Sequence, residues 1–190
     1  HRVALATALS DDADGRRHHR ALARRGFAME ASETVAQPTE PLEILLDPAG
    51  ERTILLPARP RRMTGPIPTE GFDYIYLNVR HQPDYPATAA QRAVAQMPLD
   101  PGERRPSAVV VASRSDFVIP DAALFERART TAGPDFRHLV LTAGAEPVAI
   151  LSAGGVDHVP VPSLPPGTDT TGAGDFFAAG LLDGLARGMP

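Results

Sequence analysis

The stretch of sequence that decides the fold lies near the end of the chain and reads Asp169-Thr170-Thr171-Gly172-Ala173-Gly174-Asp175. It precedes residues 176–188, in which apolar side chains at positions 177, 181, 182 and 185 recur with helical spacing. Helix geometry therefore places the Gly-Ala-Gly run at a helix N-terminus. Small residues there leave backbone N–H groups accessible, and the helix dipole adds positive potential. The stretch predicts an anion hole that uses no charged side chain.

Asp175 follows this run directly and is expected in the first turn of the helix. A carboxylate beside an anion hole fits a base that takes a proton from a hydroxyl while the N–H groups hold a transferring phosphoryl. An acidic residue in a first turn can instead simply complement the helix dipole. An isolated Gly-x-Gly-Asp leaves that choice open, because glycine patterns alone are weak signals.

Strand-like and helical segments alternate along the rest of the chain. Helices are predicted over residues 16–25, 88–96 and 121–131. Strands are predicted over residues 3–9, 74–77, 109–112, 139–142 and 148–152, the last in a hairpin with 156–161. This alternation is typical of an α/β protein with a parallel sheet covered by helices.

Residues 33–57 differ in character from the segments around them. Apolar runs at 42–46 and 52–56 flank the turn 47–50, which predicts a β-hairpin. Prolines on both sides indicate a protruding element and not a central strand. The segment is either an ordinary surface hairpin or a lid over a ligand site.

The composition excludes several kinds of chemistry. All nineteen basic residues are arginine, which excludes a Walker-A loop and lysine Schiff-base catalysis. Without cysteine there is no thiol nucleophile, disulfide or Cys-ligated metal. The net charge of −4 and the scattered arginines argue against nucleic-acid and membrane partners. Since no signal peptide or run of ~18 apolar residues is present, we expect a cytoplasmic protein.

The chain resembles the ribokinase-like (PfkB-type) carbohydrate kinase family, and residues 169–176 carry the resemblance most specifically because they match its second signature. Residues 10–15 resemble the family's Gly-x-Asp-x-x-Gly turn, with serine for the first glycine, and residues 50–53 its Gly-Glu-Arg-Thr lid hairpin. Residues 99–104 resemble its Asp-Pro-x-x-Arg segment, and residues 141–147 its nucleotide-side Thr-x-Gly-x-x-Gly turn. These stretches follow the family's order along nearly the whole chain.

The resemblance implies a ribokinase-like three-layer α/β fold, with a mostly parallel central sheet and a small β lid formed by the hairpin at about 33–57. The anion hole and its helix would occupy residues 169–188. The family's first strand with its paired-glycine signature and the helices that close its adenine pocket are not found in the sequence. We therefore expect residues 1–190 to be a partial kinase domain, truncated at both ends.

The resemblance also implies catalytic roles. Asp175 would be the catalytic base, and the N–H groups of Gly172, Ala173 and Gly174 would stabilise the transferring phosphoryl. The reaction would be ATP-dependent phosphorylation of a sugar hydroxyl, with Mg²⁺ as cofactor. A nucleoside kinase and a catalytically degenerate protein that binds a sugar or nucleotide are the alternatives. A further alternative is that the chain as given is inactive by itself.

Further residues would bind the nucleotide and a cation. Thr142 and Gly144 would line the nucleotide pocket together with Gly172 and Gly174, although a strand end and a turn glycine explain the first two equally well. Asp169 and Thr171 would contribute to the monovalent-cation (K⁺) site of some family members. Asp169 is otherwise an ordinary turn or cap residue. We also expect the protein to form a homodimer through the edges of the lid.

Three departures from the family pattern bear on these alternatives. Ser10 and Pro147 each replace a glycine, and the proline removes one backbone donor from the nucleotide turn. The family's Asn-x-x-Glu pattern is not evident where residues 112–116 read Ala-Ser-Arg-Ser-Asp. Together these departures motivate the degenerate alternative. A serine at that strand end is similar to the ketohexokinase-like branch, which slightly favours a ketose or related substrate.

Overall fold

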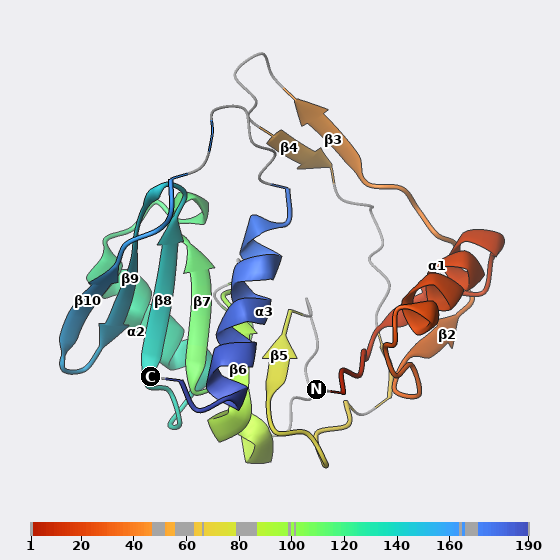
Figure 1. The fold of residues 1–190 in the computed structure, drawn as a ribbon, viewed down its shortest axis with the longest axis horizontal. Helices are drawn as coiled ribbons and strands as arrows, with labels where there is room; N and C mark the ends of the chain where they lie inside the picture. The colour runs from red at the N-terminus through yellow and green to blue at the C-terminus, as the bar shows by residue number, and fades with distance from the viewer. Residues whose placement is uncertain are drawn as a thin grey trace. The chain divides into compact units, whose positions relative to one another are not determined.

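The structure is a computed structural model that describes most of the chain in nine stretches, residues 2–46, 52–55, 63–65, 67–78, 87–98, 100, 102–163, 165 and 171–189. The chain forms two compact units, His1–Pro68 and Thr69–Pro190 (Figure 1). None of the described helices is long and apolar enough to cross a membrane.

The second unit is built on a six-stranded sheet in the order β10-β9-β8-β7-β6-β5. Its strands are β5 (Ile75–Leu77), β6 (Ala93–Gln96), β7 (Val109–Ser113), β8 (His138–Ala143), β9 (Glu146–Ser152) and β10 (Gly155–Val159). Strands β5 to β8 are parallel, and the β8–β9 and β9–β10 pairs are antiparallel. The four parallel strands therefore end at one edge of the sheet, where ligands bind in open α/β folds.

Two helices cover opposite faces of this sheet (Figure 1). Helix α2 (Asp121–Ala132) packs through Leu124 and its neighbours against a core that includes Val110 of β7. Helix α3 (Ala173–Ala186) packs through Leu181 and its neighbours against a core that includes Val111 of the same strand. Successive strand residues point to opposite faces, so consecutive valines belong to different cores. The expected three-layer α/β fold with a mostly parallel sheet is confirmed.

The prediction of a helix over residues 88–96 was wrong. A 3₁₀ helix, η1 (Ala87–Arg92), leads into β6, which pairs with β5 on one side and β7 on the other. Alanine favours helices, but Ala93, Val94 and Ala95 are all buried in the middle of the sheet. A parallel strand covered on both faces is apolar throughout and shows no alternation, so its pattern does not reveal it.

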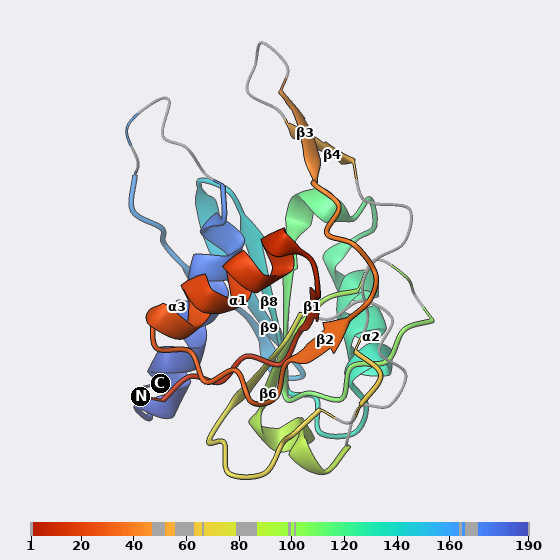
Figure 2. The same cartoon turned by 90° about the vertical axis from the view of Figure 1, so that its right-hand side faces the viewer.

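The first unit contains a parallel pair of strands, β1 (Ala8–Ser10) and β2 (Glu33–Val35), with helix α1 (Ala13–Arg24) between them in sequence (Figure 2). The predicted strand over 3–9 is shorter in the structure, with a single bridge at Ala4 before β1. The helix starts earlier than the predicted residue 16, because Asp12 caps it by accepting from Gly15 N–H (2.7 Å).

The predicted hairpin is present as β3 (Glu43–Leu46) and β4 (Arg52–Leu55), which pair antiparallel. Its turn, residues 47–50, and residue 51 lie outside the described residues. The apolar side chains of Ile44, Leu45 and Ile54 are about half exposed. Figure 2 shows β3 and β4 projecting away from β1, β2 and α1.

Candidate active site

The N-terminus of α3 has the geometry that the sequence predicted for residues 172–174. Gly172 precedes the helix with φ 78° and ψ 4°, a left-handed conformation that glycine adopts without strain. Its carbonyl accepts from Phe176 N–H (2.9 Å), and no side chain caps the helix from this position. The N–H groups of Ala173, Gly174 and Asp175 therefore have no acceptor within the helix.

Space is left beside these N–H groups. A Cβ atom built on Gly174 meets no other atom within 4 Å, so packing among the described residues does not require glycine there. Ala173, Gly174 and Asp175 are all exposed. An anion can therefore approach the first turn of α3, where both the N–H groups and the helix dipole favour negative charge.

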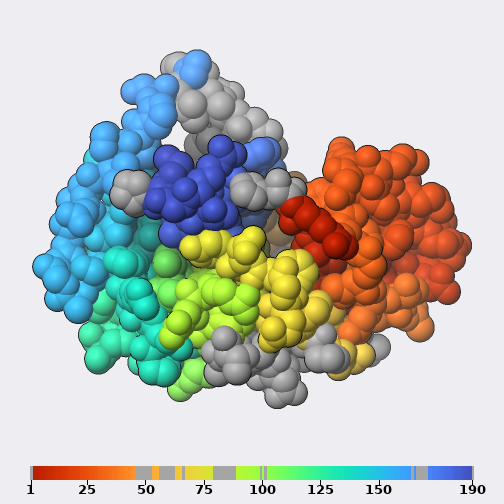
Figure 3. Space-filling model, turned by 60° about the horizontal axis from the view of Figure 1, so that its bottom comes forward, coloured from red at the N-terminus to blue at the C-terminus, as the bar shows by residue number. Residues whose placement is uncertain are grey.

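Asp175 lies within electrostatic reach of Tyr76 in strand β5. Burial raises the pKa of Tyr76 to about 12, the negative charge of Asp175 adds to this, and Arg105 opposes it. Tyr76 donates a hydrogen bond from its hydroxyl to Gln96 Oε1 at the end of β6 (3.2 Å). Figure 3, which views the opposite end of the sheet, shows the dark-blue C-terminal part of α3 beside the yellow surface near β5. The predicted base thus lies at the edge where the parallel strands end.

A buried ion pair contacts the end of β6 at this edge of the sheet. Arg105 is only 4% exposed, pairs with Glu103 (3.0 Å) and donates to the Gln96 carbonyl (2.6 Å). The sequence motif pointed instead to Arg104, which is exposed. Two adjacent arginines look alike in a sequence, and only their burial distinguishes them. Residues 99 and 101 of the same motif lie outside the described residues.

The predicted nucleotide-side residues reach the same edge. Thr142 pairs in register with Ser113, and its hydroxyl donates to the Ala112 carbonyl (3.2 Å). Gly144 lies in the β8–β9 turn with φ 62°, a conformation that favours glycine. Both residues therefore have a structural role that is sufficient to explain them. They also stand at the carboxyl end of β8, on the same side of the sheet as the start of α3.

Asp116 is a candidate residue that the sequence alone did not single out. It ends the short 3₁₀ helix η2 (Arg114–Asp116), which follows β7 directly and contacts β8. Burial raises the pKa of its carboxyl above the ordinary value. The signal was present, because Ser113 and Asp116 keep the spacing of the Asn-x-x-Glu pattern with shorter side chains.

The expected cation site is only partly visible. Thr171 is described and exposed, whereas Asp169 lies outside the described residues. Among the residues that the structure describes, no three His, Asp or Glu side chains gather to hold a metal ion. Mg²⁺ in kinases is commonly held by one or two carboxylates and the substrate phosphates, so a site without such a cluster is compatible with it.

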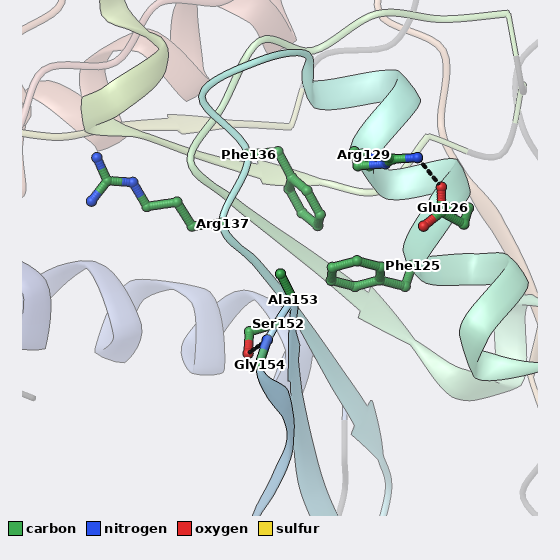
Figure 4. Close-up of a pocket in the computed structure, with 8 residues that line it drawn as sticks. All are labelled: Phe125, Glu126, Arg129, Phe136, Arg137, Ser152, Ala153 and Gly154. Atoms are coloured by element: carbon green, nitrogen blue, oxygen red, sulfur yellow. Dashed lines mark hydrogen bonds and ion pairs between the residues drawn. The ribbon is translucent and has the colours of Figure 1, made fainter.

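A pocket of about 650 Å³ lies elsewhere on the second unit (Figure 4). It is lined by α2 and by the turn between β9 and β10, with Phe125 and Phe136 forming a tilted aromatic pair. Arg129 is paired with Glu126 at its rim. Phe136 and Arg137 precede the start of β8, and Ala153 and Gly154 follow the end of β9, so the pocket lies at the edge of the sheet opposite to the start of α3 (Figure 1). The pocket is therefore separate from the candidate active site.

Comparisons with known proteins agree with this geometry. Residues 121–190 match the model of the pfkB family carbohydrate kinases, whereas no curated protein matches the chain. A ribokinase from Thermotoga maritima has 14% identity and a TM-score of 0.70, with 98% of this chain and 68% of that chain covered. A fructokinase with bound ATP from Xylella fastidiosa has 16% identity and a TM-score of 0.67, with 96% and 67% covered.

A kinase for a nucleoside is also among the similar structures. Aminoimidazole riboside kinase from Salmonella enterica, complexed with aminoimidazole riboside and an ATP analog, has 17% identity and a TM-score of 0.62, with 97% of this chain and 71% of that chain covered. At such identities the likeness shows the fold. The resemblance seen in the sequence is thus confirmed: residues 121–190 match the pfkB family of carbohydrate kinases, and the chain has the ribokinase-like fold.

Proposed function

We propose that the protein is an ATP-dependent sugar kinase of the cytoplasm that transfers the γ-phosphoryl of ATP to a sugar hydroxyl. The observation that supports this most is the open N-terminus of α3, with Gly172 left-handed and Asp175 in the first turn. A protein that only binds a ligand has no need of a carboxylate beside an anion hole. The match of residues 121–190 to a carbohydrate kinase family supports the same reaction.

The reaction follows from the chemistry of these groups. The N–H groups at the start of α3 hold the equatorial oxygens of the γ-phosphoryl, where negative charge is concentrated during transfer. Asp175 takes the proton of the sugar hydroxyl as its oxygen bonds to phosphorus. The bond between phosphorus and the bridging oxygen breaks in line, and ADP leaves with the electron pair.

Cations would assist at the same edge. We assign Asp116 as the carboxylate that would hold Mg²⁺, directly or through water, because its side chain stands at the end of β7 and carboxylate oxygens are preferred Mg²⁺ ligands. The ion would neutralise charge on the ATP phosphates. Asp169 and Thr171 remain the residues proposed for a monovalent cation, and Thr142 and Gly144 those proposed for the nucleotide.

Substitution of the base tests the proposal. Asp175→Asn keeps the size of an exposed side chain, so the variant should fold normally. Its turnover should fall at least about a hundredfold, because general-base catalysis contributes about 10²–10⁴. ADP release with a panel of ketoses, aldoses and nucleosides measures this and identifies the acceptor class. Turnover above a hundredth of the wild-type value would contradict the assignment.

A catalytically degenerate binding protein is the second candidate. Pro147 favours it, because a proline in β9 offers no N–H to a nucleotide. Ser10 does not: its buried Oγ accepts from Asp12 N–H (3.2 Å), so the serine supports the turn that the family's glycine would form. Thermal stabilisation by ATP or a sugar without any ADP release would decide for the binding protein.

The β3–β4 hairpin is assigned the role of a lid, and its exposed apolar side chains suit contact with a second copy of the chain. A strand edge with half-exposed Ile44 and Ile54 is a surface that proteins usually cover. Sedimentation analysis at several protein concentrations tests the homodimer. Ile44→Asp should shift the protein toward the monomer.

A further inference from the structure

We propose that two carboxylates, Asp12 and Glu33, fasten the two ends of the β3–β4 hairpin to the β1–α1–β2 layer and act as positioning residues for the hairpin. The fastening is a property of the first unit alone. Its consequence for the reaction rests on the proposed function, in which the hairpin serves as a lid.

The end of the hairpin that comes first in the chain is held by Asp12. Thr39 lies four residues before β3, and its N–H donates to Asp12 Oδ2 (2.6 Å). The Thr39 hydroxyl donates to Oδ1 of the same carboxylate (3.0 Å). Because Oδ1 also accepts from Gly15 N–H, one carboxylate joins the start of α1 to the approach to the hairpin.

The chain is held again after the hairpin, nine residues past the end of β4, by Glu33, the first residue of β2; residues 56–62 in between lie outside the described residues. Its Oε2 accepts from both the N–H (2.8 Å) and the hydroxyl (3.1 Å) of Thr64. Its Oε1 accepts from Gly65 N–H (2.5 Å). A Cβ atom on Gly65 would lie 2.6 Å from Oε1, so a larger residue there would require the flexible end of the Glu33 side chain to shift. Both ends thus use the same arrangement, in which a threonine gives its N–H and its hydroxyl to one carboxylate.

These bonds matter because the described part of the hairpin is small and lies outside the buried cores. Each of its strands has four residues, and an isolated two-stranded hairpin is marginally stable in water. None of the buried core clusters formed by the described residues includes a residue of β3 or β4. Hydrogen bonds to a charged acceptor are stronger than neutral ones. The orientation of the hairpin therefore depends on its two fastened ends.

The ionisation of both carboxylates is consistent with this role. Hydrogen bonds from Gly15 and Thr39 N–H groups hold the pKa of Asp12 far below its usual range. Hydrogen bonds from Thr64 and Gly65 N–H groups lower the pKa of Glu33. Both groups are therefore charged at neutral pH, and the fastening is constitutive under physiological conditions.

Amide hydrogen exchange of the full chain tests the proposal residue by residue. Glu33→Ala should speed exchange of Thr64, Gly65 and the β3–β4 amides about tenfold or more, while β1 and α1 keep their protection. Asp12→Ala should do the same for Thr39 and the hairpin, with additional loss at the first turn of α1. Glu33→Gln, which keeps an acceptor oxygen, should give a smaller effect. Asp14→Ala, in the same helix turn as the cap, should leave the hairpin unchanged.

Two outcomes would overturn the proposal. In the first, Thr64 and Gly65 lose protection in Glu33→Ala while the β3–β4 amides exchange as in the wild type, which would limit the carboxylate to its own turn. In the second, Glu33→Ala loosens the whole unit uniformly, and Thr64→Val, which removes only a hydroxyl donor, leaves the hairpin unchanged. A hairpin loosened selectively by Thr64→Val supports the fastening even if Glu33→Ala unfolds the unit.

A kinetic measurement separates this proposal from the proposed function. With the hairpin as a lid, Glu33→Ala should raise KM for the sugar several-fold and change KM for ATP less. Glu33→Gln should partly restore the sugar KM. A protein without kinase activity would still show the exchange differences. Normal exchange of the hairpin in an active Glu33→Ala enzyme would refute the fastening alone.

Discussion

Helices α1 and α3 both begin with backbone N–H groups that need an acceptor, and the residue before the helix supplies one only in α1. Asp12 turns its carboxylate onto Gly15 N–H at the start of α1. Gly172, in the same position before α3, has no side chain to offer. Helix α1 therefore has a negative charge at its start, whereas α3 has room there for a negative charge from a ligand. The glycines in the two first turns differ as well: a Cβ atom on Gly15 of α1 would meet the Ser10 backbone, whereas one on Gly174 of α3 would meet nothing within 4 Å.

A carboxylate placed before α3, as Asp12 is placed before α1, should have the largest effect on turnover. Gly172→Asp places a capping carboxylate where we propose that the phosphoryl binds, so turnover should fall about 10²–10³-fold. A left-handed residue other than glycine costs about 1–2 kcal/mol, so the melting temperature should fall by only several degrees, which is too little to explain the loss of turnover. ADP release and thermal unfolding measure the two effects separately.

Gly180→Asp is the matched control, because it adds the same charge to the same helix at a site where a Cβ meets nothing within 4 Å. It should leave turnover close to that of the wild type. If Gly172→Asp keeps its activity, the anion does not bind at this N-terminus and the open start of α3 has no role in the reaction.

The second prediction concerns the glycine that packing requires in α1. A Cβ on Gly15 would lie 2.0 Å from the Ser10 carbonyl oxygen, and backbone at both positions leaves no flexible group to move. Gly15→Ala should therefore lower the free energy of unfolding by about 3 kcal/mol, in spite of the better helix propensity of alanine. Chemical denaturation measures this loss. A stability equal to that of the wild type would show that β1 and α1 separate easily.

Gly174 in α3 should behave in the opposite way, and this third effect is smaller. Because a Cβ there meets open space, Gly174→Ala should keep or slightly raise stability, by up to about 1 kcal/mol. Turnover should still fall about tenfold, since the methyl group narrows the approach to the N–H groups. Steady-state ADP release measures the turnover, and thermal unfolding measures the stability. Unchanged turnover would mean that the phosphoryl does not approach Gly174.

The same two regions show what the sequence could and could not predict. Helix α3 and its exposed Gly-Ala-Gly start were predictable, because apolar spacing and small residues are local signals. The cap by Asp12 and its bond to Thr39 were not, since residues 27 positions apart meet only through the fold. Strand β6 was misread because its alanines favour a helix until β5 and β7 enclose them. Burial likewise selects Arg105 over Arg104 through contacts that no motif contains.

The last prediction tests the position of Asp175 without relying on activity. Its charge helps burial to raise the pKa of Tyr76 from 10.0 to about 12. In Asp175→Asn the pKa of Tyr76 should therefore fall, yet stay above 10.0, because burial is the larger cause. The raised pKa of Tyr76 contributes to the free energy of unfolding at pH values below 10, and this contribution is lost as the pH rises through 12. In Asp175→Asn the contribution should be lost at a lower pH than in the wild type. An NMR titration of the tyrosine rings, with Tyr76→Phe to assign the signal, measures the shift. An unchanged pKa would place Asp175 away from the end of β5, and the α3 N-terminus would then lack the base that distinguishes it from a simple anion site.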